Sequence, residues 1–318
     1  MSLSVVALQK NHLEEAAKLV LKGYDGQRER VPALPCWHGS LESIMPRLSE
    51  SMDRLPGAAA FQGDKLVGFV QGMLVPSLHG RRSAYVPEWG HTADANPVQT
   101  YQAMYDYLAP RWVQEGCCSH AVTLFCRPED VICEMFRYGF GMLVIDAVRD
   151  LSPVEGEMAK VQIRKASPDD MGVLLEFDER LTEHLASAPI FRWGGQSPDA
   201  DEVDRRLRDP DHLHLLACEH GQVLGYMGFG PTEARSSRVV IDDRSIACTG
   251  AYVRGGLRRR GVGAALLAEA IDRATEAGYE RCTVDFESAN VSARQFWLKH
   301  FDPITCSLAR HIGEAAAP

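Results

Sequence analysis

The sequence predicts an α+β (α/β-layered) protein built from two similar halves, and three observations indicate this. The chain has 318 residues, about twice the commonest domain size. Two hairpin patterns, each made of short apolar strands joined by a Gly-polar turn, begin at Ala58 and Ala217, half the chain apart. Strand-like and helix-like segments then follow each hairpin in the same order. We therefore expect one sheet with flanking helices in each half.

In the first half, Asn11 is a polar cap that should start a helix after a strand at 5–8. Gly116 can adopt a positive φ and should end a long helix at 98–115, although Pro110 should kink or end this helix early. The remaining expected elements are apolar strands and one short helix: a hairpin at 58–72, strands at 85–91, 120–126 and 142–148, and a helix at 131–138.

The second half repeats this order. A strand at 161–164 precedes a helix that begins after Ser167-Pro168-Asp169, and Gly278 should end a helix at 261–277 as Gly116 does. The other expected elements are the hairpin at 217–228, strands at 245–253, 282–286 and 304–310, and a helix at 291–300. The polar, Pro- and Gly-containing segment 151–158 separates the halves, so we expect domains at 1–152 and 160–318.

Composition excludes several classes of protein. Apolar residues make up 45% and charged residues 24%, as in ordinary globular chains. The net charge of -9 does not favour nucleic acid or an anionic membrane as a partner. The start of the chain does not resemble a signal peptide, and no apolar run has the length of a membrane helix. Nine cysteines without a Cys-x-x-Cys spacing indicate reduced thiols in a cytoplasmic protein without a metal site.

One loop carries the strongest chemical signal. It follows the strand at 245–253 and precedes the helix at 261–277. The first N–H groups of a helix have no internal partner and carry the positive end of its dipole, and Gly261 and Gly263 let a phosphate approach the backbone. The alternative is a flexible, glycine-containing turn whose arginines are simply solvated. The spacing fits neither a Walker loop nor a dinucleotide-binding motif. Positive charge comes from Arg254, Arg258, Arg259 and Arg260.

These residues resemble a known family. Residues 258–264 (RRRGVGA) are similar to the Arg/Gln-x-x-Gly-x-Gly/Ala signature of the GNAT acetyltransferases, and residues 290–301 (NVSARQFWLKHF) resemble a second, Asn-x-x-Ala-x-x-Phe-Tyr segment of that family. The resemblance implies two tandem GNAT-like domains, each a mixed, mostly antiparallel central sheet flanked by helices. The first domain would be degenerate and the second would bind acetyl-CoA.

The resemblance also implies how acetyl-CoA, the cosubstrate, is held. Amides of residues 259–264 would bind its pyrophosphate, and its pantetheine arm would follow 251–253, where two strands splay apart. Asn290 would hydrogen-bond the arm or a water, and N–H groups near Tyr252 would polarise the thioester carbonyl. The expected coenzyme-binding residues are Ala251, Tyr252, Val253, Arg258, Arg259, Arg260, Gly261, Val262, Gly263, Ala264, Asn290, Ser292 and Phe296.

Each of the expected catalytic residues has more than one possible role. Asp285 and Glu287 lie on one face of a strand end and are candidate general bases, or else solvated or arginine-paired carboxylates. Trp297 stands where many GNAT relatives carry a tyrosine that protonates the leaving thiolate. Ser292 or Tyr252 would then supply that proton, unless the thiolate leaves without help.

Several other residues have two interpretations. Glu183 and His184 fall where GNAT relatives shape the acceptor pocket, although both are typical of an ordinary helix surface. The acidic run 199–204 could attract a cationic acceptor or form the first turn of a helix. Three aromatic residues could line a pocket at the junction of the halves or belong to the core: Trp89, His91 and Trp193.

The predicted function is an N-acetyltransferase that moves the acetyl group of acetyl-CoA to a small-molecule amine acceptor, with its site in the C-terminal half. The first half has no arginine-glycine loop, and Asp94 would repel a phosphate there. Two alternatives remain: acetylation of an amino-thiol glycoside, as in mycothiol synthase, and a catalytically inactive coenzyme-A-binding regulatory module. A monomer or homodimer is expected, and the acceptor's identity does not follow from the sequence.

Overall fold

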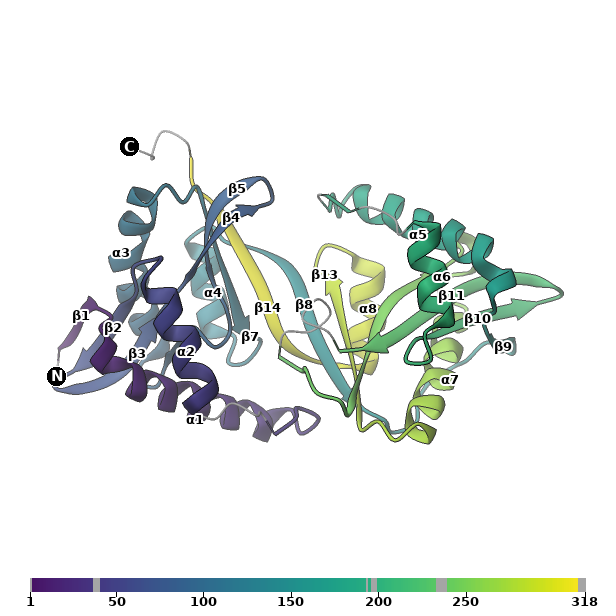
Figure 1. Cartoon of the computed structure of the whole chain (residues 1–318), viewed down its shortest axis with the longest axis horizontal. Helices are drawn as coiled ribbons and strands as arrows, with labels where there is room; N and C mark the ends of the chain where they lie inside the picture. Colours follow the sequence, from purple (N-terminus) through teal and green to yellow (C-terminus); the bar gives the residue numbers. More distant parts are fainter. Residues whose placement is uncertain (1, 37–40, 193, 196–198, 233–238, 314–318) are drawn as a thin grey trace. The chain divides into compact units, whose positions relative to one another are not determined.

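The computed structural model describes residues 2–36, 41–192, 194–195, 199–232 and 239–313. The chain divides into two compact units (Figure 1): the first comprises Met1–Val144 with Ile304–Pro318, and the second comprises Ile145–Pro303. Both units combine sheets of mixed strand direction with flanking helices, which confirms the α+β class. None of the described helices is long and apolar enough to cross a bilayer.

The first unit contains two sheets. One has the order β1-β2-β3-β6, and the other runs β4-β5-β7-β14. Its strands are β1 Leu3–Ala7, β2 Ala58–Gln62, β3 Lys65–Val70, β4 Met73–Leu78, β5 Arg81–Val86, β6 His91–Ala93, β7 Ser119–Phe125, the start of β8 Gly141–Asp150, and most of β14 Asp302–His311. Its helices are α1 Leu13–Arg30, α2 Leu41–Met52, α3 Pro97–Gln114 and α4 Asp130–Arg137, with a 3₁₀ turn at Lys10–His12.

The core of the first unit forms where α1 and α2 cover the β1-β2-β3 sheet. Leu13 and Ala16 of α1 and Leu48 of α2 are buried against Leu66 and Phe69 of β3. Burying such side chains is the main source of stability in a unit of this size. Trp89 belongs to this same core, so its interpretation as a core residue is correct.

Three details of the first unit differ from the expectation. The strand expected at 85–91 is interrupted: β5 ends at Val86, and a turn closed by the Gly90 N–H donating to the Pro87 carbonyl (2.8 Å) separates it from β6. Pro87 has no N–H to continue the ladder. Helix α3 passes through Pro110 and ends at Gln114, so the early end was wrong. Strand β4 and helix α2 were not expected.

The second unit has the sheet order β8-β13-β12-β11-β10-β9. Its strands are the remainder of β8, β9 Gln162–Lys165, β10 Leu213–Glu219, β11 Gln222–Pro231, β12 Ser245–Val253 and β13 Arg281–Glu287. Its helices are α5 Met171–Ala186, α6 Ala200–Arg208, α7 Val262–Glu276 and α8 Val291–His300, with 3₁₀ turns at Pro168–Asp170 and Gly255–Leu257. Trp193 lies outside the described residues.

Helix α7 buries the stripe that its sequence predicts. Leu266, Ala270 and Ala274 are all at most 2% exposed, while Glu269 and Arg273 form an i, i+4 ion pair at 2.8 Å on the surface. Gly278, with φ +84°, ends the helix in the left-handed conformation. The position of α7 against the sheet therefore follows from its amphipathic pattern, and this position directs its first turn toward the end of β12.

The compact units differ from two consecutive halves in their last strands. The segment from Ile304 onward pairs antiparallel with β7, from Thr305↔Phe125 to His311↔Ser119, and so belongs to the first unit. Residues 145–150 of β8 belong to the second unit. The division expected at 1–152 and 160–318 follows the chain and assigned both strands to their own halves. The last strand of each half of the sequence therefore belongs, for most of its length, to the unit formed by the other half.

Candidate active site

The N-terminus of α7 forms a cradle of unpaired backbone N–H groups. Gly261 is its N-cap with φ +78°, and the first helical bond runs from the Ala265 N–H to the Gly261 carbonyl (3.0 Å). The N–H groups of Val262, Gly263 and Ala264 therefore have no partner in the helix. They carry the positive end of the helix dipole, which makes this turn a site for an anion.

The backbone of another segment also approaches Gly261 closely. A Cβ at this position would lie 2.7 Å from the Ala159 nitrogen and 2.9 Å from the Glu157 carbonyl oxygen. The Ala159 N–H donates to the Gly261 carbonyl at 3.2 Å. A side chain is excluded both by this contact and by the left-handed conformation.

The four arginines of the loop have different roles. Arg254 is a structural residue, because its guanidinium binds both carboxylate oxygens of Glu176 (2.9 and 3.2 Å) and packs over the Phe177 ring. Arg258 lies over the Tyr252 ring and donates to the Val253 carbonyl at 3.2 Å. Arg259 and Arg260 are exposed. The side-chain charge beside the cradle that has no carboxylate partner among the described residues therefore comes from residues 258–260.

A pocket of about 450 Å³ opens beside this cradle; we call it the loop-side pocket. The structure brings together here all but one of the residues expected to bind the coenzyme, and the exception is Arg260, which is exposed but does not line the pocket. The expected residues that line it are Ala251, Tyr252, Val253, Arg258, Arg259, Gly261, Val262, Gly263, Ala264, Asn290, Ser292 and Phe296.

The two central parallel strands of the second unit separate beside this pocket. Pairing between β12 and β13 begins at Ser245↔Arg281 and stops at Ala247↔Thr283, although β12 continues to Val253 and β13 to Glu287. On its other edge, β12 stays paired with β11, with a bulge next to Gly228. Beyond this pair no ladder bonds join the two strands, and their separated ends line pockets; we call the gap between them the opening.

A second pocket, of about 410 Å³, lies at the same opening; we call it the carboxylate-side pocket because Asp285 and Glu287 line it. It shares Leu181, Ala251, Asn290, Ala293 and Trp297 with the loop-side pocket. Its remaining walls come from α6, β12 and β13 and the segment after α5. The separated strands therefore line two adjacent pockets of contrasting chemistry.

Asp285 is the most strongly perturbed carboxyl group among these residues. Its side chain is exposed to the carboxylate-side pocket. Burial in this recess and the nearby carboxylates of Asp146 and Glu287 raise the pKa of Asp285 to about 7. The guanidinium of Arg192 acts in the opposite direction and lowers this pKa. A carboxyl group with a pKa near neutrality can accept a proton efficiently.

Helix α8 provides the far wall of both pockets. Asn290 caps it: the Asn290 Oδ1 accepts from the Ala293 N–H (3.2 Å) and from the Ser292 hydroxyl (3.0 Å). Trp297 is 5% exposed and packs edge-to-face on Phe301 at 5.4 Å. The Trp297 ring therefore contributes shape and an apolar surface at this position.

His184 of α5 lines the loop-side pocket rather than the outer surface, whereas Glu183 is exposed as expected. Burial and the positive charge of Arg258 lower the pKa of His184. A hydrogen bond with Asn290 acts in the opposite direction and raises this pKa. Its partners come from segments far away in the chain, so nothing in the local helix pattern could identify it.

Polar residues of α6 and the segment after α5 were also missed. Arg192 lines the carboxylate-side pocket, with its Nε 3.9 Å from the Glu287 Oε1. Glu202, Arg205 and Arg206 line the same pocket. The acidic run 199–204 begins α6, where the Asp199 side chain accepts from the Glu202 N–H, so its interpretation as a helix first turn is correct.

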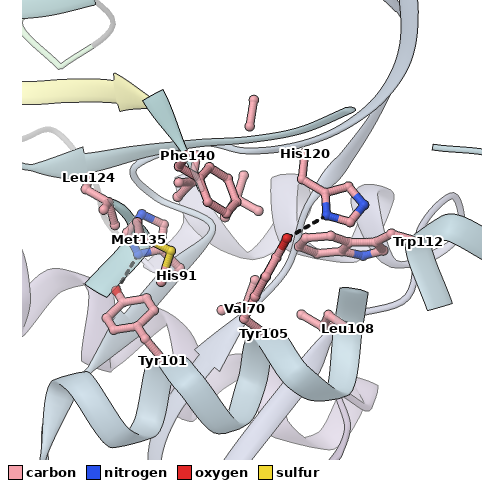
Figure 2. Close-up of a pocket in the computed structure, with 13 residues that line it drawn as sticks. Val70, His91, Tyr101, Tyr105, Leu108, Trp112, His120, Leu124, Met135 and Phe140 are labelled. Carbon is pink, nitrogen blue, oxygen red and sulfur yellow. Dashed lines mark hydrogen bonds between the residues drawn. The ribbon is translucent and has the colours of Figure 1, made fainter. Parts of the chain in front are cut away.

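The first unit has a different interior at the corresponding helix. Figure 2 shows a cavity of about 30 Å³ enclosed by aromatic side chains of α3 and neighbouring strands, room for about one water molecule. His91 and His120 both point into this group, hydrogen-bonded to Tyr101 and Tyr105. Asp94, near the start of α3, pairs with Lys22 at 2.5 Å. These residues do not form an anion cradle.

Comparison with known proteins identifies one family, in the second half of the chain. Residues 179–302 match the model of the acetyltransferase (GNAT) family. A search of curated proteins found no significant sequence match. Among the described residues, no group of three or more histidine, cysteine or acidic side chains could hold a metal.

Solved structures resemble the chain over nearly its full length. A GCN5-related N-acetyltransferase from Sphaerobacter thermophilus shares the fold over 99% of this chain and 96% of its own, with 14% identity and a TM-score of 0.54. A weaker similarity is to a tandem GNAT protein from the clavulanic acid biosynthesis pathway, with 12% identity over 98% of this chain and 99% of that chain and a TM-score of 0.46. Another is to a GCN5-related N-acetyltransferase from Kribbella flavida, with 14% identity over 99% of this chain and 72% of that chain and a TM-score of 0.42.

Proposed function

We propose that the chain transfers the acetyl group of acetyl-CoA to the amine of a small molecule. The premise is the match of residues 179–302 to the acetyltransferase (GNAT) family, whose members use an acyl-coenzyme A donor. The observation that carries this proposal is the opening between β12 and β13. The loop-side pocket meets it from one side with a phosphate-accepting helix end. The carboxylate-side pocket meets it from the other with a proton acceptor.

The donor would occupy the loop-side pocket. Its pyrophosphate fits the amides at the start of α7, with side-chain charge from Arg258 and Arg259. The Arg254 N–H donates to the Leu224 carbonyl of β11, and N–H direction alternates along an antiparallel ladder. The N–H groups of Val253 and Ala251 are therefore directed toward the opening, where they can bind the pantetheine arm or polarise the thioester carbonyl.

The chemical step needs a base and a proton donor. The acceptor nitrogen attacks the thioester carbonyl carbon, a C–N bond forms, and the C–S bond breaks as the thiolate leaves. The Asp285 carboxylate takes the proton that the amine loses, directly or through water, with Glu287 beside it. The sulfur takes a proton from Ser292 or Tyr252, because Trp297 has no acidic group. The products are the acetylated amine and coenzyme A with a free thiol.

The proposal is tested by coenzyme binding and turnover together. Calorimetry with acetyl-CoA should show that Arg258→Gln with Arg259→Gln weakens binding by at least about 10-fold, the scale of one charge-assisted hydrogen bond. Arg208→Gln is the matched control, because this arginine pairs with Asp204 at 2.7 Å outside both pockets. Equal affinities for both variants would refute the assignment of the cradle.

Turnover is measured as free thiol released on a panel of amines, which includes an amino-thiol glycoside. Release with any amine supports the transferase. Coenzyme binding without release on the whole panel would instead indicate a coenzyme-binding regulatory module, the alternative that Trp297 favours. Single variants Ser292→Ala and Tyr252→Phe then identify the proton donor, because the one that acts should lower kcat by a larger factor than it weakens coenzyme binding.

A further inference from the structure

We propose that the acceptor is an aminocarboxylate of the α-amino-acid type, with its carboxylate on Arg192 and its amine at Asp285. This inference rests on the proposed function and names the substrate class of that site. It comes from the distribution of charge in the carboxylate-side pocket, where the guanidinium of Arg192 has no carboxylate within hydrogen-bonding distance among the described residues and lies beside a group of carboxylates.

Arg192 is held in place by its backbone. It follows α5, and its N–H donates to the Leu185 carbonyl at 2.8 Å. Its side chain is 34% exposed and lines the pocket. Among the described residues, the only ion pair of this guanidinium is the 3.9 Å contact with Glu287, too long for a hydrogen bond.

The other two arginines of this pocket are already paired. Arg205 and Arg206 both bind the carboxylate of Glu202, with Nε–Oε distances of 3.0 and 2.8 Å. A planar guanidinium can donate two parallel hydrogen bonds to a carboxylate. Among the described residues, Arg192 is therefore the arginine of this pocket whose charge has no carboxylate within hydrogen-bonding distance, so its guanidinium can bind an anionic ligand.

The opposite charge lies next to Arg192. Asp285 and Glu287 share one face of β13, and Asp146 of β8 is close enough to affect the titration of Asp285. The Arg192 charge also acts on Asp285, so the two groups lie within electrostatic reach of each other. In an α-amino acid a single carbon joins the ammonium and the carboxylate. Such a zwitterion can place its two poles on adjacent groups of opposite charge.

The same charges select against other amines. A polyamine or an amine with several ammonium groups would bring a second cation next to Arg192, and like charges in a partly buried pocket repel. A neutral amine would leave the guanidinium without an anionic partner. The pocket of about 410 Å³ has room for a side chain on the acceptor. The recognised feature is therefore the amine and its adjacent carboxylate.

The test compares matched acceptor pairs. Each amino acid is assayed beside the amine that lacks its carboxylate, such as phenylalanine with phenethylamine, by thiol release. The amino acid should have the higher kcat/KM, by about 10- to 100-fold if one charge-assisted contact is involved. Arg192→Gln should remove most of this preference, because kcat/KM should fall much more for the amino acid than for the amine without the carboxylate. Arg208→Gln, outside the pocket, should preserve the preference.

The outcomes separate this inference from the proposed function. Equal or better turnover of carboxylate-free amines, or an equal loss with both members of a pair in Arg192→Gln, would overturn the inference while the transferase stands. If no amine is turned over, calorimetry of N-acetylphenylalanine with the coenzyme-A-loaded protein decides the point. Binding that Arg192→Gln abolishes supports the carboxylate site, and no binding overturns it.

Discussion

Ala247 and Thr283 form the last pair between β12 and β13, and the proposed chemistry depends on the separation of the strands beyond this point. Up to this pair the parallel ladder closes the sheet. Beyond it, the backbone of β12 faces an opening that both pockets share, and the side chains of β13 include Asp285 and Glu287. In the proposed function, a donor and an acceptor would meet where these ladder bonds are lost.

Asp285→Asn should lower kcat by about 10²- to 10⁴-fold, the usual contribution of a general base, because an amide cannot take the proton of the amine. Coenzyme affinity should stay unchanged, since Asp285 lines only the carboxylate-side pocket. In the wild type, kcat/KM should fall as the pH drops below about 7, the pKa of Asp285. Stopped assays from pH 5.5 to 8.5 measure both effects. A variant with wild-type kcat would exclude Asp285 as the base.

The same variant should alter stability in a pH-dependent way. The pKa of Asp285 is raised in the folded protein to about 7 from 3.8, so the folded state holds its proton more tightly. The associated stability is present below pH 4 and is lost as the pH rises through 7. Asp285→Asn cannot ionise, so it should raise the melting temperature at pH 8 and have less effect at pH 5. Equal shifts at both pH values would contradict the raised pKa.

Gly261→Ala should destabilise the protein more than Gly278→Ala. Both glycines have positive φ, +78° and +84°, so each substitution has a conformational cost of about 1–3 kcal/mol. A Cβ at Gly278 meets nothing within 4 Å, whereas one at Gly261 would collide with the backbone of 157–159. Urea unfolding measures the difference between the two variants, and calorimetry should show weaker acetyl-CoA binding for Gly261→Ala alone. Equal unfolding free energies would show that the 157–159 segment does not pack against Gly261.

One coenzyme should bind per chain. The cradle in the second unit combines free helix amides with arginines. In the first unit, Pro97 starts α3, Asp94 lies just before it, and the interior cavity of about 30 Å³ is too small for a coenzyme. Calorimetric titration with acetyl-CoA should saturate at one equivalent. Saturation at two equivalents would mean that the first unit also binds it.

The elements around the loop follow closely from local sequence. Strand β12 (Ser245–Val253) and helix α8 (Val291–His300) have the bounds that the sequence predicts. An apolar β-branched run and an asparagine cap are local signals, so no distant contact is needed to place them. The arginine-glycine loop was recognisable for the same reason, because a helix end creates its anion site from neighbouring residues.

Residues whose role depends on distant partners could not be predicted. Arg192 meets Glu287, and His184 meets Arg258 and Asn290, only after the chain folds. Before folding, both resemble ordinary polar residues of a helix and the segment after it. The pairing of β14 with β7 could not be predicted for a similar reason. The alternation of side chains along a strand shows which face is buried, but it does not show which strand lies next to it.

His120 should make the first unit sensitive to acid. It is fully buried beside Trp112, with ring centroids 5.1 Å apart (Figure 2), and its Nε2 has no partner among the described residues. Burial lowers the pKa of His120 from 6.5 to about 4, so unfolding takes up a proton between these values. Stability should therefore fall as the pH drops from 6.5 to 4.

In His120→Leu this fall in stability should be shallower. It is measured as the difference between the urea midpoints at pH 7 and pH 5, followed by tryptophan fluorescence. The control His220→Gln, at an exposed histidine, should keep the wild-type slope. Comparing slopes removes the pH-independent cost of leaving the Tyr105 hydroxyl without the ring. An unchanged slope in His120→Leu would show that His120 does not titrate on unfolding.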